Sequence, residues 1–164
     1  MHEVQSGREQ ADYTGAVYGS LLAASVVVGA SPGKNDTPGV AVGVLIVATG
    51  LVFWFAHVYA RLVGERRYGE RLTWAHTRRV ARAERPLAEA ALPPALVAVL
   101  CWALGASSTT TGWITLVTAL AGQVVWATVA GVRAGIGRNL VVAFAVGNLF
   151  IGMMIVVLKV ALTH

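Results

Sequence analysis

The chain has 164 residues, of which 56% are hydrophobic and 13% are charged, and its mean hydropathy is +0.65. Soluble domains of this size carry about 25% charged residues, so the chain has too few charges to cover a water-facing surface, and we expect lipid to be its main solvent. The net charge of +5 does not indicate a nucleic-acid partner, because the basic residues are concentrated in one segment between apolar segments, a distribution that membrane topology explains.

Five segments of about 17 residues or more are mostly apolar, and each is long enough to cross the hydrocarbon core of a bilayer as a helix. In chain order, they cover residues 14–30, 40–62, 87–104, 113–132 and 140–161. Short connections rich in Gly, Pro, Asn and Ser separate the first span from the second and the last three spans from one another. The sequence therefore predicts an all-α polytopic membrane protein with five transmembrane helices in a single domain, residues 1–164.

The segment before the first span does not have the composition of a secretory leader. It contains one arginine, Arg8, against three acidic residues, Glu3, Glu9 and Asp12, whereas such leaders begin with a basic region. We therefore expect the first apolar segment to remain in the protein as a span.

Most of the positive charge lies between the second and third spans, in residues 64–86. This segment contains seven arginines against three glutamates, and Arg61 adds another positive charge at its edge. Because cytoplasmic loops are enriched in Lys and Arg, we expect the segment and the N-terminus to be cytoplasmic and the C-terminus to be outside, with the protein in the plasma (inner) membrane. With this topology, 11 of the 13 Lys and Arg residues lie on the cytoplasmic side.

Residues 64–86 allow two structural interpretations. They form either a solvated loop or helical extension that sets the orientation of the protein, or an interfacial helix that inserts Tyr68, Leu72 and Trp74 into the surface of an anionic membrane. Anionic lipid or an acidic protein is the expected partner of the arginines in this segment, which include Arg66, Arg67, Arg71, Arg78, Arg79 and Arg82.

The most distinctive polar group within a span is His57, in the sequence GLVFWFAHVYAR. A histidine can change its charge near neutral pH, and an ionisable group inside a bilayer is a candidate functional group. His57 shares a helical stripe with Gly43, Gly50, Trp54 and Arg61, which indicates a face that packs on neighbouring helices. Either His57 makes a single interhelical hydrogen bond, or it is a proton-coupled or ligand-contacting group.

Other polar residues are candidates for the same pathway. Tyr59 lies roughly 200° around the helix from His57, so it belongs either to an interfacial aromatic belt or to the pathway. Thr128 and Asn148 are expected at a depth similar to that of His57. Asn148, like Gln123, either joins two helices by hydrogen bonds or lines the pathway.

Glu89 is the acidic candidate in the third span. It follows Pro86 and is either a first-turn acid that interacts favourably with the helix dipole or a member of the polar pathway. The pair Pro93–Pro94 comes just after it and should kink or break this span inside the membrane, as happens where helices line a cavity.

Several chemistries are not supported by the sequence. It contains no GxSxG, HExxH or P-loop motif and no paired carboxylates within the spans. Cys101 is the single cysteine, which excludes a disulfide, a redox pair or a cysteine zinc site within one chain. Bis-histidine haem binding needs a second buried imidazole, whereas His2, His76 and His164 lie in a tail or a loop. We therefore expect no cofactor or metal, and an intramembrane enzyme lacks the base and nucleophile that it needs.

Two functions remain as hypotheses. The first is a homo-oligomeric ion or small-solute channel or transporter, with His57, Glu89 and Asn148 in its polar lining and the small-residue stripes as assembly faces. The second is a non-catalytic subunit of a larger membrane complex, in which His57 is structural and the arginine-rich segment docks an acidic partner or lipid.

Overall fold

A computed structural model describes residues 2–30, 37–64 and 73–163, and the side chains within them except those of residues 2–14, 159, 162 and 163. The described residues are helical apart from short turns and contain no strand. In chain order, the helices are α1 (His2–Gly29), α2 (Gly39–Gly64), α3 (Trp74–Ala83), α4 (Arg85–Glu89), α5 (Leu92–Ala103), α6 (Ser108–Arg133) and α7 (Arg138–Thr163).

Four helical segments of the described chain are long and apolar enough to cross a membrane. They are Gly39–Gly64, Arg85–Ala103, Ser108–Arg133 and Arg138–Leu158, and a shorter apolar helix covers Gly15–Gly29. The expected all-α membrane protein is thus confirmed in its main features: the chain is a small helical membrane protein. The first apolar segment differs from the others because its apolar part is shorter, although α1 itself extends back to His2.

One helix start differs from the sequence-based expectation. Helix α6 begins at Ser108, five residues before the expected start at residue 113, because the Ser107 hydroxyl accepts a hydrogen bond from the Thr110 N–H at 3.1 Å and caps the helix. The expected arginine-rich segment contains a helix, α3, over its second half. The expected third span is interrupted between α4 and α5. Pro93 and Pro94 lie in the first turn of α5, where backbone N–H groups have no partner within the helix, so these prolines cost no helical hydrogen bond.

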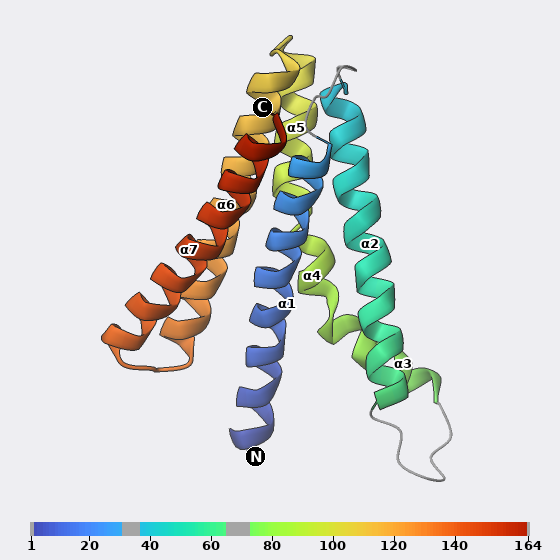
Figure 1. Cartoon of the computed structure of the whole chain (residues 1–164). Coiled ribbons are helices and arrows are strands. Elements are labelled where there is room, and N and C mark those ends of the chain that lie inside the picture. The colour runs from blue at the N-terminus through green and yellow to red at the C-terminus, as the bar shows by residue number, and fades with distance from the viewer. Residues whose placement is uncertain (1, 31–36, 65–72, 164) are drawn as a thin grey trace.

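The long helices run in alternating directions through one bundle (Figure 1). The N-terminus lies at one end of the bundle together with α3 and the α6–α7 turn, and the C-terminus lies toward the other end. The α6–α7 pair splays away from α1 toward the end that holds the N-terminus.

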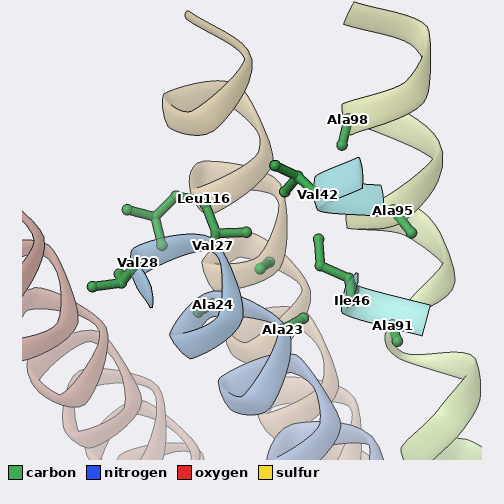
Figure 2. Close-up of a cluster of buried hydrophobic side chains, with 11 residues drawn as sticks. Ala23, Ala24, Val27, Val28, Val42, Ile46, Ala91, Ala95, Ala98 and Leu116 are labelled. Carbon is green, nitrogen blue, oxygen red and sulfur yellow. The ribbon is translucent and has the colours of Figure 1, made fainter. Parts of the chain in front are cut away.

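The core consists mainly of small aliphatic side chains. Figure 2 shows residues of α1, α2, α5 and α6 meeting there, among them Ala24, Val27, Ile46, Ala95 and Leu116, all buried. Small residues let helix backbones approach closely, which favours association where lipid provides no hydrophobic driving force.

The small-residue stripe of α2 is used inside the protomer. A Cβ added at Gly43 would lie 2.9 Å from Val99 and 3.0 Å from the Ala95 carbonyl oxygen, and one added at Gly50 would lie 2.9 Å from the Ala91 methyl group. These glycines therefore pack on α5 and on the α4–α5 junction. The stripe was expected to pack on neighbouring helices, and Gly43 and Gly50 do so within the protomer, so these two glycines are not available as an assembly face between protomers.

Candidate functional site

Two polar contacts join the C-terminal half of α2 to α3 and to Glu84, the residue that follows α3. Trp54 donates its indole N–H to the Ala81 carbonyl oxygen at 3.0 Å. Seven residues later, Arg61 forms an ion pair with Glu84 at 2.7 Å. The Glu84 side chain is only 10% exposed and that of Arg61 is 37% exposed. Trp54 and Arg61, two members of the stripe that contains His57, thus hold the arginine-rich segment against α2.

His57 is half-buried and faces α1. Its Nδ1 lies 3.1 Å from the Phe53 carbonyl oxygen of its own helix, and because a carbonyl oxygen can only accept, Nδ1 carries the proton in this contact. The Tyr18 ring lies with its centroid 5.4 Å from that of the imidazole, and Tyr18 also meets the Phe53 ring edge-on at 6.3 Å. In a neutral imidazole, this arrangement leaves Nε2 as an acceptor.

Glu89 and Tyr59 lie in different surroundings from His57. Glu89 is the last residue of α4 and pairs with Arg85 of the same helix at 2.8 Å, with about half of its side chain exposed. Tyr59 is 70% exposed, on a part of α2 that faces away from the bundle. The structure thus pairs Glu89 locally and gives His57 its contacts on α1 and α2.

Asn148 is brought together with Gln123. The Gln123 amide is completely buried, and its Nε2 donates to Asn148 Oδ1 at 2.9 Å and approaches the Asn148 backbone oxygen at 3.3 Å. Asn148 Nδ2 donates in turn to the Phe144 carbonyl oxygen at 3.0 Å. Within the part of the chain that the structure describes, Gln123 Oε1 has no hydrogen-bond partner. An unsatisfied buried carbonyl is unusual and calls for an explanation.

Further hydroxyl groups lie along α6. Thr128 is half-buried and donates to the Val124 carbonyl oxygen at 2.7 Å, so its hydroxyl is satisfied within the helix. Thr115 is completely buried, and no described residue hydrogen-bonds to its Oγ1. Ser20 of α1 is also buried and donates to the Ala16 carbonyl oxygen at 3.0 Å. An added Cβ at Gly122 would lie 3.5 Å from the Ser20 hydroxyl, so this hydroxyl lies at the interface between α1 and α6.

Two pockets lie beside the Gln123–Asn148 pair. A pocket of about 740 Å³ lies between α1, α6 and α7, where α6 and α7 splay from α1, and its polar lining side chains are Tyr18 and Asn148. A second pocket, of about 430 Å³, lies in the groove between α6 and α7 and is lined by both Gln123 and Asn148. Asn148 therefore lines both pockets and Gln123 lines the smaller one, while Tyr18 lines the larger pocket and contacts the His57 ring.

The expected arginine cluster is only partly within the described residues. Arg66, Arg67 and Arg71, with Tyr68 and Leu72, lie outside them. The remaining three, Arg78, Arg79 and Arg82, are exposed on α3, and Trp74 at the start of that helix is 74% exposed.

Sequence reasoning missed two residues of this region, Glu84 and Tyr18. Glu84 is one of several glutamates in a basic segment, and only the return of the chain along α2 brings it to Arg61. Tyr18 lies in an apolar span, and the sequence around it did not identify it as a site residue. The signal that could have identified it is its hydroxyl, because a tyrosine hydroxyl needs a hydrogen-bond partner when it is buried.

The described part of the chain contains no group of three or more His, Cys, Asp or Glu side chains placed to hold a metal ion. No family model, curated protein or solved structure matches the chain.

Proposed function

We propose that the protein is a membrane transport protein for a small neutral solute that donates hydrogen bonds, and that Gln123 and Asn148 recognise this solute. The observation that carries the proposal is Gln123 Oε1, a fully buried carbonyl oxygen of a candidate membrane-spanning helix that has no hydrogen-bond partner among the described residues. Leaving such an acceptor unsatisfied costs about 1–3 kcal/mol. A solute that donates a hydrogen bond to this oxygen would remove that cost.

The lining of the larger pocket supports a neutral and mostly apolar solute. Apart from Tyr18 and Asn148, its lining residues are aliphatic or aromatic, such as Leu21, Ala130 and Phe144, and none is charged. Its volume of about 740 Å³ is in the range of small-molecule sites, which combine an apolar lining with a few polar groups that orient the ligand. In this proposal, the solute passes from this pocket to the groove between α6 and α7 by exchanging hydrogen bonds with the amide pair.

His57 supplies a pH-responsive element in this proposal. Its ring contacts Tyr18, which lines the larger pocket. Protonation of the imidazole would place a cation beside the Tyr18 ring, where the π face attracts it, and would favour one position of that ring. Replacing His57 by Gln should therefore flatten the dependence of transport on pH.

We further propose that the protein functions as a homo-oligomer in the plasma membrane, with the N-terminal end of the bundle in the cytoplasm. Helix α7 supports the oligomer: only 6% of its membrane segment is buried within the protomer, against 28–33% for the other three long spans. The orientation follows the distribution of Lys and Arg.

Solute flux into proteoliposomes tests the proposal. Stopped-flow swelling measures the flux of four neutral probes: urea, acetamide, propane-1,3-diol and glycerol. Separate assays measure the fluxes of protons and K⁺. We expect wild type to transport at least one neutral probe faster than protein-free vesicles and Gln123→Leu to lose this transport. Thr118→Val is the matched control, because the Thr118 hydroxyl bonds only to the Ile114 carbonyl oxygen of its own helix, at 2.8 Å. Flux of ions alone, or equal flux in Gln123→Leu and wild type, would contradict the proposal.

A second candidate is an assembly subunit of a larger membrane complex. The exposure of α7 favours it too, since a partner's helix could cover the same surface. This function predicts a stoichiometric partner that co-purifies in mild detergent and is lost when Arg78, Arg79 and Arg82 are neutralised together. A pure homo-oligomer under the same conditions would argue against it.

A further inference from the structure

The exposed face of α3 is basic and aromatic. At about 100° per residue, Trp74, Arg78, Arg79 and Arg82 fall within roughly 140° of one another around the helix, and all four are exposed. Val80, on the opposite side, is 4% exposed. Helix α3 is therefore amphipathic, with an apolar side packed on the protein and a cationic side turned outward.

The three arginines of this face lack acidic partners among the described residues, whereas their neighbours are paired. Arg61 pairs with Glu84 and Arg85 pairs with Glu89, but no ion pair or hydrogen bond engages the guanidinium groups of the α3 face within the described chain. Three adjacent cations without counter-charges repel one another, so the face is electrostatically complementary to anions.

The position of α3 indicates where those anions lie. The helix follows the end of one membrane span, α2, and precedes Arg85, where the next candidate span begins. The Trp54–Ala81 hydrogen bond and the Arg61–Glu84 ion pair hold it against α2, at the end of the bundle that holds the N-terminus (Figure 1). This is the level of the lipid headgroups, where exposed tryptophans such as Trp74 are also enriched.

We propose that the exposed face of α3, formed by Trp74, Arg78, Arg79 and Arg82, is a binding site for the headgroups of anionic phospholipids in the membrane that the protein spans. Guanidinium groups bind phosphate oxygens through paired hydrogen bonds, and the Trp74 ring has an apolar face for the adjoining acyl region. A bilayer supplies both a phosphate layer and an apolar layer at this depth, whereas an acidic protein segment supplies the charge alone.

Lipid selectivity of the full-length protein tests the site. Native mass spectrometry in detergent gives the relative affinity for phosphatidylglycerol over phosphatidylcholine. Near an anionic surface, each arginine contributes about fivefold in binding, so Arg78→Gln with Arg82→Gln should lower the preference for phosphatidylglycerol by about tenfold or more. The charge-preserving pair Arg78→Lys with Arg82→Lys should retain most of it.

A second pair of substitutions provides the control for net charge. Arg133→Gln with Arg138→Gln also removes two positive charges at the same end of the bundle, but from the α6–α7 turn, and should lower the preference by less than about twofold. Equal losses in the two Gln pairs would overturn the site on α3. Equal binding of the two lipids by wild type would also overturn it and would leave an acidic protein segment as the ligand.

The depth of Trp74 gives an independent readout that does not depend on detergent. In nanodiscs, brominated phosphatidylglycerol should quench the tryptophan fluorescence of wild type more than the tryptophan fluorescence of Trp74→Phe. This difference should be smaller when the brominated lipid is phosphatidylcholine. Identical quenching of wild type and Trp74→Phe by brominated phosphatidylglycerol would contradict contact between this face and the lipid.

Discussion

Helix α1 contacts the rest of the bundle through two surfaces that are packed in opposite ways. Toward α4, Gly19 lies so close that an added Cβ would overlap the Leu87 carbonyl oxygen, and Leu87 is itself completely buried. Toward α7 and the second half of α6, a pocket of about 740 Å³ opens between the helices.

The two surfaces show two different ways in which helices associate in lipid. Glycine and alanine join α1 to α4 and α2 to α5 by close backbone approach. A pocket of about 820 Å³ also lies between α2 and α5, but its lining residues are all apolar and offer no side-chain hydrogen bond to a solute. Helix α7 contacts α6 at Gly152 and Gly131 and also through a hydrogen bond between the buried Gln123 and the partly buried Asn148, beside two pockets. We infer that the first surface maintains the fold and that the second is where a solute can enter.

The largest effect should come from the tightly packed surface. Gly19→Ala should lower the free energy of unfolding by about 3 kcal/mol, because the added methyl group meets backbone atoms of Leu87 and the two helices must separate. Denaturation in mixed micelles measures the change. Gly29→Ala on the same helix is the control and should leave stability unchanged, since nothing lies within 4 Å of its added Cβ. Equal stabilities of the two variants would show that close approach at Gly19 does not hold the helices together.

A smaller loss should follow from breaking the ion pair at the end of α2. Arg61→Gln leaves the buried Glu84 carboxylate without its cation and should cost about 2 kcal/mol, less than for a fully buried pair because Arg61 is partly exposed. Arg85→Gln, which breaks the exposed pair with Glu89, should cost about 0.3 kcal/mol. Similar losses in both variants, measured by the same denaturation, would contradict a structural role for Glu84.

The amide pair should contribute little to stability. Interhelical hydrogen bonds in membrane proteins average about 0.6 kcal/mol, and Gln123→Leu also removes the unsatisfied Oε1. We therefore expect this variant to unfold within about 1 kcal/mol of wild type while losing transport. A loss of several kcal/mol would indicate that Gln123 is mainly structural.

The smallest effect on folding is expected at Gly147. Gly147→Leu adds a side chain to an open surface of α7, so the stability of the protomer should not change. If a second copy packs on α7, the same change should shift the protein from oligomer to monomer in cross-linking or analytical ultracentrifugation. An unchanged oligomer would exclude the surface around Gly147 as its interface.

Much of the fold was predictable because lipid imposes a strong rule. A segment that crosses a bilayer must be apolar and must satisfy its backbone hydrogen bonds internally, so hydropathy alone located the main helices. The start of α6 was misplaced because Ser107 caps a turn of polar residues that hydropathy assigns to a connection. The helix within residues 64–86 remained undecided because its arginines suit a loop and an interfacial helix equally well.

The contacts of the candidate site were less accessible to sequence reasoning. The spacing of Gly43, Gly50 and His57 identified one face of α2, but it could not identify which helices cover it. The bond between Gln123 and Asn148 joins residues 25 positions apart and depends on how far α6 and α7 slide past each other. Pairing of Tyr18 with His57 depends likewise on the packing of α1 against α2, which no local pattern specifies.

The central claim, that a solute binds at the amide pair, is tested most directly by the carbon resonance of the Gln123 side-chain carbonyl. Solid-state NMR of protein labelled with ¹³C at glutamine, in lipid and with Gln123→Leu for assignment, reports hydrogen bonding at Oε1. We expect this resonance to move on saturation with whichever neutral probe the protein transports, because Oε1 then accepts a hydrogen bond that it lacks without the solute. A resonance that stays unchanged while that probe is transported would contradict the proposed site.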